Sequence, residues 1–202
     1  LTQKSKQQSL LSQEVKNKKS LASEKALKQR TIDNYKKQEK KLSNELKKKE
    51  KQAKQLQAQI QKIINEELAK ARKANKTATP KENAEDMELS NDFLSNKGRL
   101  PWPTAKSTVI REYGRYKHKS GGENMNYGIE LLTDRGAIVR SVFDGKVTRI
   151  ATGPNGQKMV FIKHGNYITV YTNLENVSVK EGTEVATKQK LGTVHTNNEN
   201  RA

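Results

Sequence analysis

The sequence opens with a run without glycine or proline that includes all of residues 1–75, and this run constrains the fold more than any other feature. The run consists largely of Lys, Gln, Glu, Leu, Ser and Ala, most of which are good helix formers. Its apolar side chains recur at alternating steps of three and four residues, which places them on one face of a helix. Residues 1–75 are therefore predicted to form long helix.

The apolar face of this helix is a narrow seam of sixteen positions, ten of them apolar. A seam this narrow does not hold a lone helix in water, so we interpret the segment as a coiled-coil strand. Its partner helix can come from the same chain or from another one. A straight rod and a hairpin bent near Asp33 and Asn34 both fit the pattern. The ten apolar seam residues are Leu11, Leu21, Ile32, Tyr35, Leu42, Leu46, Ala53, Leu56, Ile60 and Ile63.

Charge is concentrated in the same segment. The whole chain has 40 basic and 22 acidic residues, a net charge of +18, and residues 1–75 hold 21 of the basic and 8 of the acidic ones. The simplest interpretation of the lysine runs is a solvated coiled-coil face, and binding to a polyanion is the alternative. Nucleic acid is not an expected partner, because the segment has two arginines and Tyr35 as its only aromatic residue.

Other classes of protein are excluded by the residues that the sequence lacks. The sequence contains no cysteine, which excludes disulfides and thiolate metal sites. No apolar run approaches the roughly 20 residues that a transmembrane helix needs.

Residues 76–98 are predicted to be a linker. Pro80 interrupts the first helix, and the acidic stretch from Asn83 to Asp86 can start another. Four apolar residues then fall roughly on one helical face, which predicts a latch helix that packs on the following domain. The latch residues are Met87, Leu89, Phe93 and Leu94.

Residues 99–202 are predicted to form a small antiparallel β domain, so the fold class is α+β. Short β-branched and aromatic runs alternate with turns rich in Gly, Asn and Asp, and about 100 residues suffice for one core. The only tryptophan, Trp102, is expected to anchor that core. The predicted strands are 108–113, 127–132, 137–142, 145–151, 159–164, 167–172 and 191–195.

This part of the sequence contains a series of short motifs in a characteristic order and spacing. They are NKGRLPWP (96–103), EYG (112–114), YGIE (127–130), GAIVRSVFDGK (136–146), VFIKHG (160–165), YTNL (171–174) and VKEG (179–182). The order and spacing of these motifs, more than any single one of them, resemble LytM-type (lysostaphin-like) zinc metallopeptidase domains, which cut peptidoglycan. The resemblance covers nearly all of residues 96–194.

The residues that this resemblance places in the active site are not those of an active peptidase. In the family, a His and an Asp four residues apart and the last His of a His-x-His pair bind zinc, and a further His assists the attacking water. The corresponding residues here are Asn126, Glu130 and, for the assisting His, Asn173. Asparagine is a poor zinc ligand and cannot act as a general base near neutral pH.

The other family positions do not restore a zinc site. The His-x-His pair would follow Ala202, so the domain is expected to be C-terminally incomplete in this sequence. His118, His164 and His195 fall outside the ligand positions and are interpreted as structural. We therefore expect a degenerate peptidase domain that is not an enzyme and has no metal cofactor.

A coiled coil joined to a degenerate LytM-type domain resembles the EnvC-like murein hydrolase activators. The resemblance implies an extracytoplasmic protein that activates a peptidoglycan amidase in cell division and receives its signal through the coiled coil from a cell-division ABC transporter. The amidase would bind the former catalytic groove, which the latch would occupy at rest. An active zinc endopeptidase and a basic wall-binding structural protein are the alternatives. The expected groove residues are Tyr113, Arg115, Tyr116, Asn126, Tyr127, Glu130 and Asn173.

Overall fold

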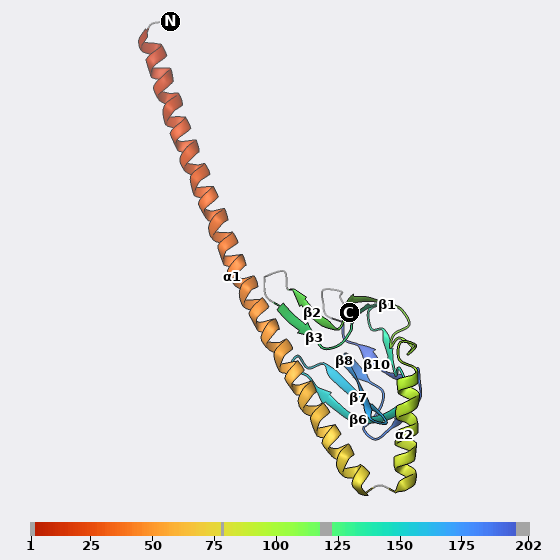
Figure 1. Cartoon of the computed structure of the whole chain (residues 1–202). Helices are drawn as coiled ribbons and strands as arrows, with labels where there is room; N and C mark the ends of the chain where they lie inside the picture. Colours follow the sequence, from red (N-terminus) through yellow and green to blue (C-terminus); the bar gives the residue numbers. More distant parts are fainter. Residues whose placement is uncertain (1–2, 78, 118–122, 197–202) are drawn as a thin grey trace. The chain divides into compact units, whose positions relative to one another are not determined.

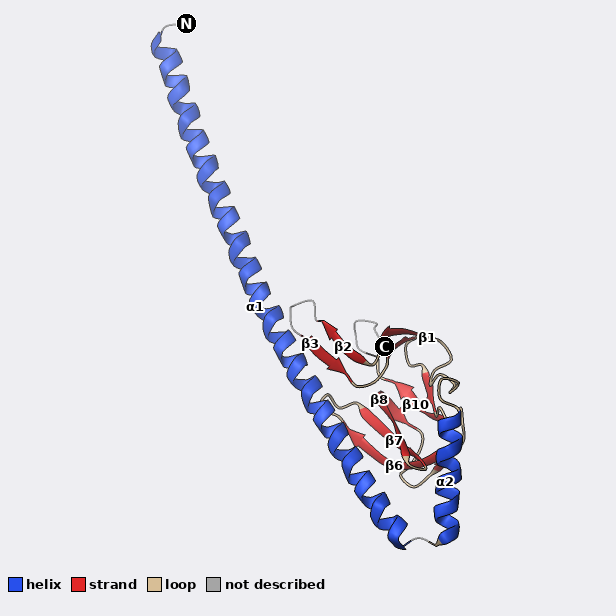
Figure 2. Cartoon of the chain, in the orientation of Figure 1, coloured by secondary structure: helices blue, strands red, loops and turns tan. Residues whose placement is uncertain are grey.

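The computed structural model describes residues 3–77, 79–117 and 123–196. Its chain divides into two compact units, residues 1–54 and residues 55–202, which are treated separately below. Figures 1 and 2 show two helices and ten strands, in the order in which they are labelled along the chain. In the described part of the chain, no helix combines the length and the apolar character needed to cross a bilayer.

The predicted long helix is confirmed as α1, Gln3–Thr77. In the first unit nearly every side chain of α1 is exposed, and this includes large apolar ones such as Leu21, Ile32 and Leu42. Among residues 3–54 these side chains have no partner helix within the first unit, so the coiled coil itself remains a prediction.

The last part of α1 belongs to the second unit and packs on a β-sheet. Ile63 is 7% exposed and lies in a cluster with Met159 and Phe161, while Leu56 and Ile60 pack around them. These three α1 residues were assigned to a coiled-coil seam. For this stretch, the expectation that the seam packs against another helix is wrong, because its partner is the sheet.

The second helix, α2 (Pro80–Ser95), lies in the region predicted to be a linker. Proline at its first position suits a helix start, since the fixed φ is helical and the missing N–H has no partner there anyway. Figure 2 shows α2 and the 55–77 part of α1 on different sides of the strands.

All strand pairs in the β domain are antiparallel. Six strands form the main sheet in the order β5-β10-β8-β7-β6-β9, and two pairs, β1-β4 and β2-β3, form small separate sheets. The strands are β1 Ser107–Arg111, β2 Gly114–Lys117, β3 Glu123–Asn126, β4 Glu130–Thr133, β5 Ile138–Arg140, β6 Gly145–Thr152, β7 Lys158–His164, β8 Tyr167–Val177, β9 Glu184–Val185 and β10 Lys190–Val194.

Both faces of the main sheet are buried, and successive residues of a strand point to opposite faces. On β7, Met159 and Phe161 face the last part of α1, whereas Val160 and Ile162 face the domain core. That core also includes Leu174 and six further buried side chains, those of Val139, Val147, Tyr171, Val185, Leu191 and Val194. One face of the main sheet is therefore covered by the last part of α1, and the other face contributes to the domain core.

The predicted strands were found, with shifts of up to five residues at their ends, and three further strands were missed. The missed strands are β2, β3 and β9, which are short and mostly polar. Trp102 was expected in the core, but it is 53% exposed. The core instead relies on aliphatic side chains of the main sheet.

Candidate functional site

The two small strand pairs, β1-β4 and β2-β3, position most of the expected groove residues. The chain passes from β1 to β2 through Glu112 and Tyr113, and from β3 to β4 through residues 127–129. The side-chain amide of Asn126 connects these two links, since its nitrogen donates one hydrogen bond to the carbonyl of Glu112 (2.9 Å) and another to the carbonyl of Gly128 (2.7 Å). Asn126 thus holds together the two connecting segments, residues 112–113 and 127–129. We call these two segments together with Asn126 the corner.

The carboxylate of Glu130 is held in an ion pair. The Nε of Arg111 lies 3.0 Å from Glu130 Oε2, and β1 and β4 place the two residues opposite each other. The same guanidinium lies 3.8 Å above the ring of Tyr116, in a cation–π contact. A second, longer pair joins Arg115 to Glu123 at 3.9 Å on the neighbouring pair of strands. Arg111 therefore links β1, β2 and β4 through side chains.

The sequence did not identify Arg111 as a site residue. The strand pattern placed Arg111 within a predicted strand, but its opposite residue depends on a register shift between Val109 and Arg111. A bulge of this kind leaves no clear trace in the periodicity.

Asn173 lies on β8 in the main sheet. Its φ is 61°, in the left-handed region that Asn tolerates better than most residues. The backbone carbonyl of Asn173 accepts a hydrogen bond from the N–H of His195 (2.8 Å), and its side-chain amide donates a long one to the carbonyl of His195 (3.5 Å). Among the described contacts, Asn173 is linked to the end of β10 and not to Asn126 or Glu130.

The side chains at these three positions are engaged in other contacts in this structure. The Asn126 nitrogen already donates two hydrogen bonds, Glu130 is paired with a cation, and Asn173 presents an amide. Zinc in proteins prefers His, Asp, Glu and Cys. Within residues 3–77, 79–117 and 123–196, no group of three His, Cys, Asp or Glu side chains is placed to hold a metal ion.

Exposed apolar side chains surround this corner. Tyr113 is 67% exposed, Tyr127 59% and Ile129 56%, and Ile110 on β1 is 58% exposed. The two isoleucines were not among the predicted groove residues. An apolar group of this kind on the surface is typical of a site that binds a partner.

The latch helix contacts a different part of the domain. Phe93 of α2 stacks on His164 (ring centroids 4.9 Å apart) and on Tyr167 (5.2 Å), at the turn between β7 and β8. Asn173 lies six residues further along β8, roughly 20 Å away at the usual rise of a strand. The expectation that the latch occupies the groove is therefore not met in this structure. Of the other latch residues, Leu89 is half-buried, and Met87 and Leu94 are more than half exposed.

Polar contacts fix α2 to the same turn. The Nζ of Lys163 lies 2.5 Å from Asp86 Oδ2, and Ser90 Oγ accepts a hydrogen bond from the N–H of Asn166 (2.8 Å). Ser90 is itself buried. Sequence reasoning singled out the apolar residues of this helix and missed the polar ones, which do much of the docking.

Of the three histidines, His164 is completely buried. Its Nδ1 lies 2.5 Å from the carbonyl of Asp144, and its Nε2 lies 2.8 Å from the hydroxyl of Thr169. Burial lowers the pKa of His164, although the carbonyl and the charge of Asp144 oppose this. Both ring nitrogens serve the fold, as predicted for this residue. His195 is half-buried at the end of β10, and His118 lies outside the described residues.

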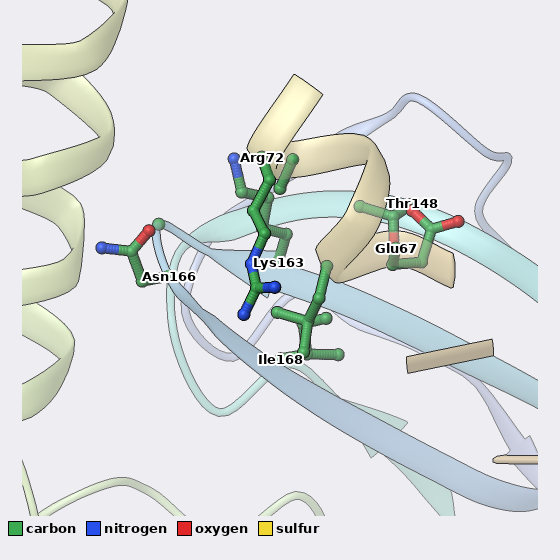
Figure 3. A pocket seen from close by; sticks show the side chains of 9 residues that line it. Glu67, Arg72, Thr148, Lys163, Asn166 and Ile168 are labelled. Carbon is green, nitrogen blue, oxygen red and sulfur yellow. The ribbon is translucent and has the colours of Figure 1, made fainter. Parts of the chain in front are cut away.

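A pocket of about 140 Å³ lies between the end of α1 and the β7–β8 turn (Figure 3). The hydroxyl of Thr148 is buried there without a hydrogen-bond partner, and Lys163 is already paired with Asp86. The pocket is separate from the groove residues. Its lining residues are Glu67, Leu68, Ala71, Arg72, Thr148, Lys163, Gly165, Asn166 and Ile168.

The comparison with protein-family models agrees with the resemblance found in the sequence. Residues 124–202 match peptidase family M23. This region contains Asn126, Glu130 and Asn173, so the positions that differ from the family pattern lie inside the matched residues. A search of the curated proteins gave no match.

Three solved structures illustrate the partial similarity of this chain to known proteins. A zinc-containing peptidase from Vibrio cholerae is 28% identical, with a TM-score of 0.44 over 46% of this chain and 31% of that one. Csd3 from Helicobacter pylori is 24% identical, with a TM-score of 0.41 over 48% and 28%. LytU is 28% identical, with a TM-score of 0.39 over 44% and 61%. The chain thus spans less than a third of the first two structures.

The role of Asn126 can be tested through stability. We expect Asn126→Ala to lower the free energy of unfolding by about 1–2 kcal/mol, because two backbone carbonyls lose their donor. Urea-induced unfolding measures this change. Asn124→Ala on the same strand is the matched control, since the Asn124 side chain makes none of the described hydrogen bonds. Equal losses in both variants would show that Asn126 does not fix this corner.

Proposed function

We propose that this chain is a non-catalytic activator of peptidoglycan amidases. The proposal rests on the contacts made by the residues at the expected zinc-ligand positions. Asn126 is committed to two backbone carbonyls, and Glu130 is neutralised by Arg111. A zinc ion at this place would have to displace a guanidinium that is held by both a carboxylate and an aromatic ring.

The same arrangement supports a binding function. Arg111 and Asn126 stiffen the corner, and the apolar side chains of Tyr113, Tyr127 and Ile129 remain exposed around it. A rigid apolar surface loses little conformational entropy on binding. We propose that it accepts the apolar face of a helix from the amidase, which is a common mode of recognition.

The remaining parts of the proposal concern the long helix and the location. We propose that the first unit of α1 forms a coiled coil that passes a signal from a cell-division ABC transporter to the M23-type domain. An extracytoplasmic location, in the periplasm or the cell envelope, follows from a peptidoglycan hydrolase as partner.

A dye-release assay on purified peptidoglycan tests the activity directly. We expect no release by this protein alone, slow release by a candidate amidase alone, and release at least about 5-fold faster from the mixture. Release by the protein alone would instead support the zinc endopeptidase. One tightly bound zinc per chain by metal analysis would contradict the activator proposal as well.

The binding surface is tested in the same assay with two tyrosine variants. Tyr113→Ala is expected to reduce activation at least about 5-fold, as for an aromatic residue central to an interface. Tyr35→Ala is the matched control, because Tyr35 is also 67% exposed but lies in the first unit. We expect it to change activation in the purified system by less than about 2-fold. Equal effects of the two variants would rule out the corner as the amidase site.

A further inference from the structure

The charges of the first unit are separated onto two sides of α1. Relative to the apolar seam, the seam positions and their flanks hold six basic and five acidic residues of residues 1–54. The three remaining heptad positions, which are neighbours on the helix surface, hold eleven basic residues and one acidic one. We call these eleven residues the basic stripe: Lys6, Lys16, Lys19, Arg30, Lys37, Lys40, Lys41, Lys47, Lys48, Lys51 and Lys54.

The basic stripe is exposed and unpaired in the described structure. All eleven side chains are exposed, and none of them takes part in an ion pair among residues 3–54. The ion pair in this unit, Lys18–Glu14 at 2.9 Å, lies on the seam. The only acidic residue among the stripe positions, Asp33, accepts a hydrogen bond from Gln29 instead.

This arrangement is unfavourable for an isolated helix. Lysines repeat at spacings of three and four, as in Lys37–Lys40 and Lys47–Lys51, and each such pair destabilises a helix by a few tenths of a kcal/mol. A solvated helix face usually mixes both signs and gains from such spacings. An anion that spans the stripe would turn this repulsion into attraction.

We propose that the basic stripe binds a linear phosphodiester polymer that carries no bases, of the kind represented by poly(glycerol phosphate). The stripe runs for about 72 Å along the helix, with one positive charge per roughly 6.5 Å. This spacing is shorter than the screening length of about 8 Å at physiological salt, so neighbouring charges act together on an extended polyanion.

The composition of the stripe favours phosphates over other partners. Ten of its eleven members are lysines, which bind phosphate as point charges. It contains no aromatic residue to stack on bases. Leu27 is the single large apolar residue at these positions, so this face has no apolar surface to insert into a lipid bilayer. The proposal goes beyond amidase activation and does not depend on it.

The test uses the full chain and labelled poly(glycerol phosphate). The stripe variant replaces Lys37, Lys40, Lys41, Lys47, Lys48 and Lys51 with Gln. The matched control replaces the six basic residues of the seam side, Lys4, Lys18, Lys25, Lys28, Lys36 and Lys49, with Gln. Both variants lose six charges and keep a good helix former at each position. Circular dichroism is the control that checks whether both variants remain helical.

We expect the stripe variant to bind at least about 30-fold more weakly and the control to stay within about 3-fold of the unchanged chain. With six phosphates neutralised, doubling the salt from 0.1 to 0.2 M should weaken binding of the unchanged chain by about 18-fold, at the salt dependence typical of single strands. Equal losses in both variants would overturn the proposal, because binding would then follow net charge alone.

Two other ligands separate this proposal from its competitors. If the chain binds phosphatidylglycerol vesicles but not poly(glycerol phosphate), the stripe is a membrane-binding surface and the proposal is overturned. Single-stranded oligonucleotides that bind more than about 10-fold tighter than poly(glycerol phosphate) would overturn it in favour of nucleic acid. Similar affinity for the oligonucleotide supports recognition of the phosphodiester chain alone.

Discussion

Phe161→Ala is expected to lower the free energy of unfolding of the second unit by about 3–5 kcal/mol. Phe161 is completely buried on the face of β7 that α1 covers, in contact with Ile63 and Met159 in one cluster. Removing the ring leaves a cavity between a helix and a sheet, and neither can collapse fully into it. Urea-induced unfolding of the full chain, monitored by a β-sheet signal, measures the loss.

Two further variants show whether α1 is responsible. Ile63→Ala should cost about 2–5 kcal/mol, and the double variant should lose less than the sum, because both side chains fill the same cluster. Leu27→Ala in the first unit is the control and should change stability by less than about 0.5 kcal/mol, since Leu27 is 66% exposed. If Ile63→Ala has no effect while Phe161→Ala does, the helix does not cover this face in solution.

The contrast between Ile63 and Leu42 shows what the helical period can predict. Both residues occupy the same seam, and the spacing of three and four correctly identified a continuous helix with one apolar face. The period does not identify the partner of that face, because a sheet and a second helix accept the same stripe. Ile63 packs on β7, whereas Leu42 remains 65% exposed.

Strand prediction succeeded where side chains are buried and failed where they are not. The runs around Val160 and Val170 are β-branched and aromatic because both faces of the main sheet are covered. In contrast, β2 and β3 contain mainly polar residues and pair only with each other, so no burial pattern marks them. Residues 118–122, between these two strands in the sequence, lie outside the described residues.

The contacts made at the candidate site could not be predicted from the sequence. Resemblance located Asn126 and Glu130, and the identity of Asn126 predicted poor zinc binding. The hydrogen bonds that Asn126 makes depend on the backbone of Glu112 and Gly128, which only the folded corner brings together. Arg111 is opposite Glu130 through a register shift, which a local sequence pattern does not reveal.

Gly165→Ala is expected to release α2 from the β domain. The φ of Gly165 is +62°, and an alanine there costs about 1–2 kcal/mol of backbone strain. Its Cβ would also collide with the Ser90 hydroxyl and with the carbonyl of Asp86, both on α2. Helix backbone cannot yield locally, so α2 must move away and lose the contacts of Phe93 with His164. We expect hydrogen exchange in α2 to accelerate by at least about 30-fold while the main sheet stays protected.

Gly156→Ala is the control that separates the effect of backbone strain from the effect of the steric clash with α2. Gly156 also has a positive φ, +84°, but nothing lies within 4 Å of an added Cβ there. This variant therefore carries the backbone strain without touching α2, and exchange in α2 should stay within about 3-fold of the unchanged chain. If both variants expose α2 equally, general destabilisation explains the result and the docking contacts of Ser90 and Asp86 contribute little. A selective effect of Gly165→Ala means that α2 is held at the β7–β8 turn, about 20 Å along β8 from Asn173, which leaves the proposed amidase surface accessible while α2 is docked.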